Sequence, residues 1–146
     1  MKQIAELIEG QTLQVIEPGW NVRTAAAHMT EWNIGAVAVV DSGRLAGIFS
    51  ERDIMARVVA RGLDPEETIV SGVMSTELVV VEPTERVESA IQKMHSIGSR
   101  HLPVVDDGKL VGMLSIRDLL EVDDQHQRAR ATFLSELVTY SPDYDS

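Results

Sequence analysis

Two heptapeptides decide the fold of this chain: Gly47-Ile48-Phe49-Ser50-Glu51-Arg52-Asp53 and, 65 residues further on, Gly112-Met113-Leu114-Ser115-Ile116-Arg117-Asp118. We call them the first and the second motif. The same shift aligns 40 residue pairs around them without a gap, and fifteen of those pairs are identical. An internal repeat is the signature of one structural unit built more than once. The chain is therefore predicted to form two half-domains that pack with pseudo-two-fold symmetry, and to build a ligand cleft twice.

Each copy shows the same order of patterns. A short β run, Leu13–Ile16 or Leu78–Val81, precedes a proline and then an amphipathic helix with apolar residues at i, i+3, i+4 and i+7. Two more β runs follow, joined by an Asx/Gly turn typical of hairpins, and a helix begins at the motif serine. The predicted unit is β-α-β-β-α, of fold class α/β (α+β). The apolar helix positions are Val22, Ala25, Ala26, Met29 and Trp32 in the first copy, and Val87, Ala90, Ile91, Met94 and Ile97 in the second.

The repeats divide the chain into three predicted parts. Residues 1–62 hold the first repeat with an N-terminal segment, and residues 63–122 hold a linker and the second repeat. Residues 123–146 hold a helix near 125–140 and an acidic tail. That last helix carries Phe133, Leu137 and Val138 at helical spacing, so it is expected to bury an apolar stripe.

Composition limits the possible functions. The 146 residues include 44% hydrophobic residues, enough for a core, and carry a formal charge of −10, which disfavours nucleic-acid binding. No apolar run approaches the roughly 18 to 20 residues of a membrane helix, and the N-terminus lacks a signal-peptide pattern. There are no cysteines, so disulfides and thiol catalysis are excluded. We expect a cytoplasmic protein without membrane contact.

The Ser-x-x-Asp core of each motif has two interpretations. It is a capping box, in which the serine and the acid satisfy free backbone N–H groups at a helix start. It also suits a nucleotide, because a helix N-terminus attracts phosphate and a carboxylate one turn inside can accept both ribose hydroxyls. The recurrence of strand, glycine, serine, arginine, aspartate and helix at one offset favours the second interpretation.

The second repeat adds Leu102-Pro103-Val104-Val105-Asp106 before its motif. Together these patterns resemble a tandem cystathionine-β-synthase (CBS) domain pair, or Bateman module, of the small stand-alone bacterial type. The resemblance covers roughly residues 10–122. It implies a sensor whose clefts between the repeats bind an adenosine-containing ligand such as AMP, ADP, ATP, NAD or S-adenosylmethionine.

The resemblance also implies a role for each motif residue. Asp53 and Asp118 would hold the ribose hydroxyls, and Ser50 and Ser115 would contact phosphate. The arginines between them, Arg52 and Arg117, would either reach phosphate or face solvent.

Outside the motifs, the backbone of Val37 and of Leu102 would meet the adenine edge, and Met74 would line an adenine pocket. The second repeat has Arg100, His101 and Pro103 where the first has small residues, so the two clefts are predicted to differ. Arg100 should favour anionic ligands. His101 would either touch phosphate or lie at the surface.

Catalysis and metal binding find little support in the sequence. The four histidines are scattered, without metal-ligand spacing, and no histidine stands near either motif serine as a base would. His28 is interpreted as a surface or capping residue. We predict a non-enzymatic regulatory nucleotide sensor that has no obligatory cofactor and forms a homodimer, with Trp32 and the stripe near 133–138 as contact candidates. The alternative is a ligand-free dimerisation or adaptor protein, in which both motifs are capping boxes only. The sequence does not name a downstream protein partner.

Overall fold

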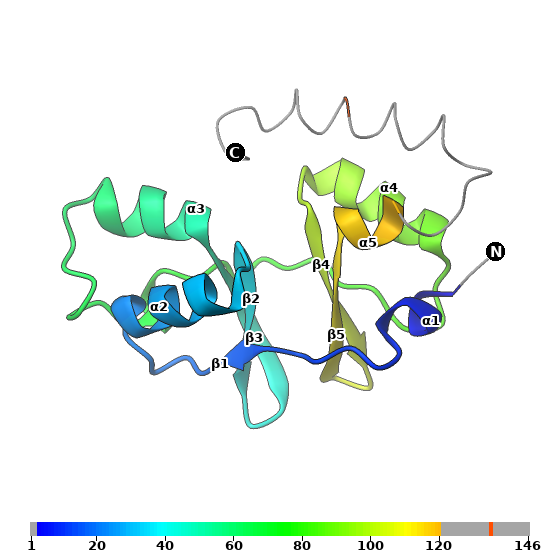
Figure 1. The fold of residues 1–146 in the computed structure, drawn as a ribbon, viewed down its shortest axis with the longest axis horizontal. Helices are drawn as coiled ribbons and strands as arrows, with labels where there is room; N and C mark the ends of the chain where they lie inside the picture. Colours follow the sequence, from blue (N-terminus) through cyan, green and yellow to red (C-terminus); the bar gives the residue numbers. More distant parts are fainter. Residues whose placement is uncertain (1–2, 121–134, 136–146) are drawn as a thin grey trace. The chain divides into compact units, whose positions relative to one another are not determined.

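The computed structural model describes residues 3–120 and Ser135, and Figure 1 traces their elements. These residues belong to two units. The first-repeat unit holds residues 12–78 with 108–110, and the second-repeat unit holds residues 3–11, 79–107 and 111–120. The predicted helix near 125–140, with its apolar stripe, lies outside the described residues apart from Ser135.

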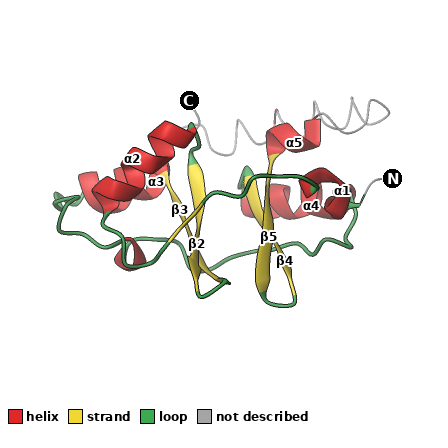
Figure 2. Ribbon diagram, turned by 60° about the horizontal axis from the view of Figure 1, so that its bottom comes forward, coloured by secondary structure: helices red, strands yellow, loops and turns green. Residues whose placement is uncertain are grey.

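The first-repeat unit follows the predicted order of elements. It consists of β1 (Val15–Ile16), α2 (Val22–Trp32), β2 (Ala36–Asp41), β3 (Arg44–Ser50), α3 (Glu51–Asp53), the π-helix η1 (Ile54–Val59) and the 3-10 helix η2 (Val70–Gly72). Strand β1 pairs parallel with β2, and β2 pairs antiparallel with β3. Helices α2 and α3 lie on one face of the β2–β3 hairpin (Figures 1 and 2).

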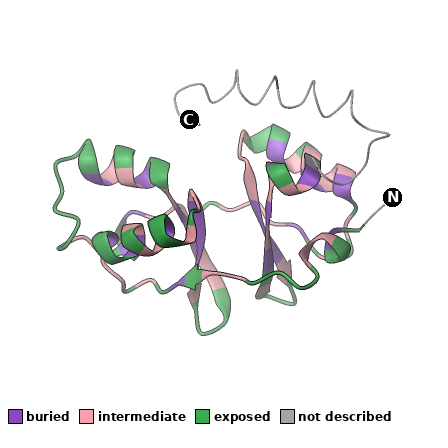
Figure 3. Cartoon of the chain, viewed as in Figure 1, coloured by how far each residue is buried: buried purple, intermediate pink, exposed green. Residues whose placement is uncertain are grey.

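Local sequence explains why α2 begins and ends where it does. The Asn21 side chain accepts a hydrogen bond from the Thr24 N–H at 2.8 Å, which caps the N-terminus. The helix ends at Asn33, whose φ of 57° is left-handed, a conformation that Asn tolerates. The predicted apolar face is confirmed, because Val22, Ala25 and Met29 are buried. They share a core with β2 and β3 residues (Figure 3).

The predicted hairpin turns are also confirmed. In the first repeat, both central turn residues have positive φ, 54° at Ser42 and 83° at Gly43. The second repeat repeats this geometry, with 53° at Asp107 and 79° at Gly108. Two consecutive positive φ angles match the turn type whose twist suits a two-residue hairpin loop.

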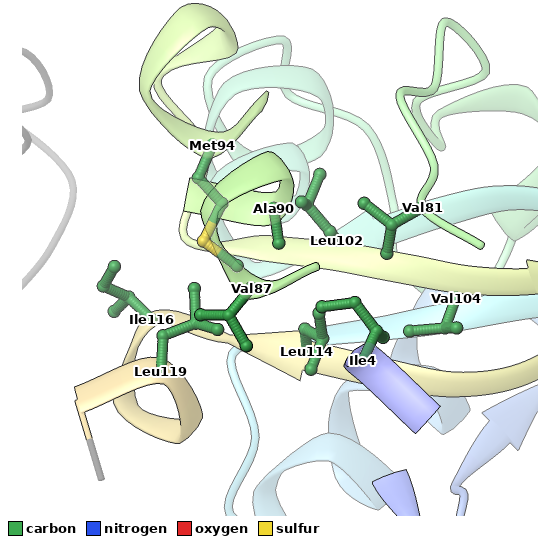
Figure 4. Close-up of a cluster of buried hydrophobic side chains, with 10 residues drawn as sticks. All are labelled: Ile4, Val81, Val87, Ala90, Met94, Leu102, Val104, Leu114, Ile116 and Leu119. Carbon is green, nitrogen blue, oxygen red and sulfur yellow. The ribbon is translucent and has the colours of Figure 1, made fainter. Parts of the chain in front are cut away.

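The second-repeat unit consists of α1 (Ile4–Ile8), α4 (Val87–Ile97), β4 (His101–Asp106), residues 111–115 of β5 (Lys109–Ser115) and α5 (Ile116–Leu120). Its core combines residues of all five elements with Val81 (Figure 4). The core residues are Ile4, Val81, Val87, Ala90, Met94, Leu102, Val104, Leu114, Ile116 and Leu119.

Helix α1 packs in the second-repeat unit, although the sequence grouped it with the first repeat. Ile4 is fully buried in that core, beside Leu114 and Val104 in Figure 4. The N–H groups of Ile4 and Ala5 donate to the carbonyls of Glu85 and Pro83, both at 2.9 Å. These bonds satisfy free donors of the first helical turn.

The expected strand at Leu78–Val81 is wrong, because only Val81 forms a bridge, with Val104 of β4. The Val81 N–H donates to the Pro103 carbonyl at 3.0 Å, and the Val105 N–H donates to the Val81 carbonyl at 2.8 Å. The next parallel bond toward Val79 would need an N–H on Pro103, and proline has none. In the first repeat Ala38 occupies this place, and β1 pairs there.

Candidate functional site

The first motif forms a closed capping box where β3 runs into α3. The Ser50 N–H donates to Asp53 Oδ2 at 2.9 Å, and the Asp53 N–H donates to Ser50 Oγ at 3.2 Å. The Ser50 hydroxyl also donates to Asp53 Oδ2, at 3.0 Å. The Glu51 N–H donates to the Gly35 carbonyl at 2.9 Å. The Ser50 N–H, the Ser50 hydroxyl and the Glu51 N–H, at the helix start where phosphate was predicted to bind, therefore donate to groups of the protein.

The other carboxylate oxygen of Asp53 is bound by the segment that leads out of the first repeat. The Ser75 hydroxyl donates to Asp53 Oδ1 at 3.2 Å, and Arg57 Nε lies 3.7 Å from the same oxygen. Arg57 also donates to the carbonyls of Val73 at 3.3 Å and Met74 at 3.0 Å. Asp53 is 6% exposed, and among the described residues it is the one charged residue that is buried. Its surroundings therefore supply the pairing that a buried carboxylate needs.

Gly47 explains how this segment comes so close to the motif. Ile48 and Ser75 exchange two backbone hydrogen bonds, at 3.0 and 2.8 Å. A Cβ atom on Gly47 would lie 2.8 Å from the Ser75 carbonyl oxygen and 2.7 Å from Met74 Sδ. Only glycine leaves room for this contact, and the group that occupies the room is the backbone of Ser75.

The second motif shares the backbone geometry of the first but has fewer partners. The Ser115 N–H donates to Asp118 Oδ2 at 2.9 Å, and the Asp118 N–H donates to Ser115 Oγ at 3.2 Å. The Ile116 N–H donates to the Arg100 carbonyl at 2.9 Å, as Glu51 does to Gly35. Asp118 is half-buried. Within the described part of the chain, no hydroxyl group and no cation binds its carboxylate.

The strand residues of the second motif, at the end of β5, are covered by the N-terminal segment. The Gln11 side-chain amide donates to the Met113 carbonyl and accepts from the Met113 N–H, both at 2.9 Å. A Cβ atom on Gly112 would lie 2.8 Å from Ile8 Cγ2. The corresponding strand of the first repeat pairs instead with the backbone of Ser75. The two motifs therefore share a sequence pattern and differ in what surrounds them.

The remaining predicted site residues fall into the two units separately. In the first-repeat unit, Val37 is buried in β2, Met74 is half-buried against Gly47, and Arg52 is exposed. In the second-repeat unit, Arg100 directly precedes β4, and its carbonyl accepts a hydrogen bond from the Ile116 N–H at the start of α5. His101, Leu102 and Pro103 are the first residues of β4. Arg100 and His101 are half-buried, Leu102 and Pro103 are buried, and Arg117 of α5 is exposed.

A hollow of about 360 Å³ in the first-repeat unit lies between α2 and the start of α3. Its walls include Met29, Asn33, Gly35 and Glu51. None of the predicted ligand residues of that unit lines it. The predicted ligand group Asp53 faces the Val73–Ser75 segment instead.

Sequence reasoning missed three residues that shape these sites: Arg57, Ser75 and Gln11. Arg57 follows Asp53 by four residues, the spacing of a helical ion pair, and this signal was available. Ser75 and Gln11 bind partners that are 22 and 102 residues away in the chain, and no local sequence pattern predicts such contacts. In the described part of the chain, no helix is both long and apolar enough to span a bilayer, and no three His, Asp or Glu side chains gather as a metal site requires.

Comparison with known proteins agrees with the duplicated unit. A family model described as CBS domain matches residues 11–60 and 70–124. The Bacillus subtilis CBS domain-containing protein YhcV is 42% identical over 104 residues, which cover 71% of this chain and 74% of YhcV. Other curated relatives are longer, and the chain covers 51% and 50% of two of them.

Solved structures show the same relationship. A CBS-domain protein from Burkholderia ambifaria is 33% identical and superposes with a TM-score of 0.77, covering 85% of this chain and 96% of that one. A hexameric CBS-CP12 protein from bloom-forming cyanobacteria is 26% identical with a TM-score of 0.75, covering 97% and 78%. With two matches to one family model in register with the two repeats, the chain belongs to the CBS-domain family as a tandem pair of CBS repeats.

Proposed function

We propose that this protein is a regulatory module that binds an adenosine-containing ligand, such as AMP, ADP, ATP, NAD or S-adenosylmethionine, and that it is not an enzyme. The observation that carries this proposal is the Asp118 carboxylate at the junction of β5 and α5. It is half-buried, held in position by the Ser115 N–H, and retains acceptor capacity. A positioned carboxylate can accept hydrogen bonds from both hydroxyls of a ribose.

The neighbouring chain supplies further suitable chemistry. The Arg100 carbonyl binds the first N–H of α5, so the Arg100-His101 stretch begins close to the second motif. An arginine there can pair with a phosphate group of the ligand. The first repeat has Gly35-Ala36 at the same alignment positions and lacks this cation. Selectivity for phosphorylated ligands is therefore assigned to the second repeat.

The alternative is a ligand-free adaptor, and a specific observation favours it. The first motif is a complete capping box, and its bonds satisfy the helix start without any ligand. If the second motif has the same structural task, neither repeat needs a nucleotide.

A thermal-shift and calorimetric screen separates these functions. The full chain is tested with AMP, ADP, ATP, NAD and S-adenosylmethionine, and GMP and UMP are the controls for base selectivity. A ligand at 100 times its dissociation constant should stabilise the protein by about 2.7 kcal/mol. Stabilisation by an adenosine ligand and not by UMP supports the sensor. No shift with any of the five adenosine ligands supports the adaptor.

We also propose that the chain associates as a homodimer. Met55 and Val59 lie one turn apart on η1 and are 50% and 65% exposed, an apolar pair that a second copy would cover. Trp32, the contact candidate from the sequence, is half-buried on α2. Sedimentation at micromolar concentration should give about twice the 16.1 kDa chain mass. The double variant Met55→Lys/Val59→Lys should then sediment as a monomer, whereas an unchanged mass would place the interface elsewhere.

A further inference from the structure

The two motif carboxylates differ in how many hydrogen-bond acceptor positions they have left. An ionised carboxylate offers about four lone-pair sites. Asp53 accepts three hydrogen bonds, from the Ser50 N–H and the Ser50 hydroxyl on Oδ2 and from the Ser75 hydroxyl on Oδ1, and Arg57 Nε forms an ion pair with Oδ1 at 3.7 Å. Among the described residues, Asp118 is met by the Ser115 N–H. Asp53 therefore has fewer acceptor positions left for a ligand than Asp118, and its charge is already paired within the protein.

The sequence shows that one of these partners is not repeated. The shift of 65 residues that carries Asp53 to Asp118 carries Arg57 to Val122. Valine has no polar side-chain atom, so it cannot repeat the bonds of Arg57. The aspartate is kept in both repeats, while the arginine that pairs with it is present in the first repeat alone.

We propose that the two carboxylates have separate tasks. Asp118 is the ribose-binding group of the protein, and Asp53 is a structural group that holds the Val73–Ser75 segment against β3. This inference rests on the proposed function and deepens it, because it assigns nucleotide binding to the second repeat and predicts one ligand per chain.

Burial and charge support this division. Asp53 is 6% exposed, whereas Asp118 is half-buried and so remains reachable from solvent. A ribose hydroxyl that binds Asp53 Oδ1 would have to displace the Ser75 hydroxyl. It would also compete with Arg57 for the same oxygen. The same segment is also bound through the Ile48–Ser75 backbone pair and the Arg57 bonds to two carbonyls, so Ser75 is held in place by several contacts. A ligand at Asp118 has no such group to displace among the described residues.

The test uses the full chain and two readouts, calorimetric titration with AMP and with ATP, and thermal unfolding without ligand. The matched variants are Asp53→Asn and Asp118→Asn, which remove one charge each and keep the side-chain shape. Wild type should bind about one nucleotide per chain. Asp118→Asn should weaken binding at least about tenfold and leave the unfolding temperature of the free protein nearly unchanged. Asp53→Asn should lower that temperature and change affinity by less than about twofold.

Ser75→Ala covers the case in which Asp53→Asn does not fold. It removes one donor to Asp53, and it should lower the unfolding temperature without weakening nucleotide binding. Two sites per chain, or a tenfold loss of affinity in Asp53→Asn or Ser75→Ala, would overturn the division of tasks while leaving the sensor function in place. If wild type binds no adenosine ligand, the proposed function fails. The structural task of Asp53 is then judged by unfolding alone: a lower temperature in Asp53→Asn than in Asp118→Asn supports it, and equal temperatures reject it.

Discussion

Ser75 donates a hydrogen bond from its hydroxyl to Asp53 Oδ1 at 3.2 Å, across 22 residues of chain. This contact joins the motif of the first repeat to the segment that leads into the second. The segment is consequently held at three points: by this side-chain bond, by the Ile48 backbone and by Arg57. Its position depends on the motif itself, and several substitutions around it have predictable effects.

Gly47→Ala should destabilise the protein by about 1 to 3 kcal/mol, the usual cost of overpacking. The new Cβ atom would lie 2.8 Å from the Ser75 carbonyl oxygen, and that backbone atom has little room to move. Urea unfolding provides the measurement. Gly19→Ala is the matched control, because nothing lies within 4 Å of its Cβ position, and it should have little effect. Equal effects of the two variants would contradict the close approach at Gly47.

Gly112→Ala should displace α1. The nearest atoms are Ile8 Cγ2 at 2.8 Å and Ile8 Cβ at 3.0 Å, and a change of rotamer moves Cγ2 but not Cβ, so the backbone of α1 has to shift. The expected consequence is a weaker attachment of α1, which amide hydrogen exchange at Ile4 and Ala5 would detect as lost protection. Unchanged protection at those two amides would show that α1 does not depend on Gly112.

Arg57→Met should destabilise the first-repeat unit by about 1 to 3 kcal/mol. The variant keeps much of the aliphatic stem but removes the donors to two carbonyls and the cation beside the buried Asp53. Denaturant unfolding followed by tryptophan fluorescence measures this, since both tryptophans of the chain belong to that unit. The control is Arg61→Met, at an exposed position. If both variants unfold at the same denaturant concentration, the bonds of Arg57 contribute nothing measurable.

Glu85 should make stability depend on acid pH. Burial raises its pKa, but hydrogen bonds from the Ser89 hydroxyl and the Glu82 N–H, together with the Lys93 ammonium, outweigh burial and lower the pKa below its ordinary value of 4.5. A carboxyl whose pKa is lower in the folded state stabilises the fold above its unfolded pKa, and this contribution is lost as the pH falls through the folded pKa. The difference in unfolding free energy between wild type and Glu85→Gln should therefore be largest near neutral pH and shrink below about pH 4.5. The exposed Glu67→Gln is the control, and the same pH dependence there would remove the assignment to Glu85.

His28 lies between the two tryptophans, with ring centroids 4.8 Å from Trp20 and 5.1 Å from Trp32. The sequence indicated a surface or capping histidine, and its Nδ1 does lie 3.0 Å from the Thr24 carbonyl oxygen, but the tilted ring contacts with both tryptophans were not predicted. His28→Leu should alter the near-ultraviolet circular dichroism of the tryptophans and cost about 0.5 to 1.5 kcal/mol for each lost ring pair. His95→Leu, in the second-repeat unit, should leave that spectrum unchanged.

The sequence by itself determined the repeat, the two helix faces and the hairpin turns. These features depend on residues close together in the chain: the spacing of Val22 and Met29 sets a helix face, and Ser42-Gly43 sets a turn. The CBS resemblance rested on the same local patterns. It also made Asp53 and Asp118 equivalent, because a repeat of residue types carries no information about what packs against them.

Only the tertiary structure decided how the two aspartates differ. Ser75 and Arg57 bind Asp53, and Gln11 binds Met113 within the second motif, through contacts that span up to 102 residues. The placement of α1 in the second-repeat core and the loss of the strand before Pro83 have the same origin. Local periodicity sets which face of an element is apolar, but the partner of that face, and the hydrogen bonds left over for a ligand, depend on which distant segments fold against it.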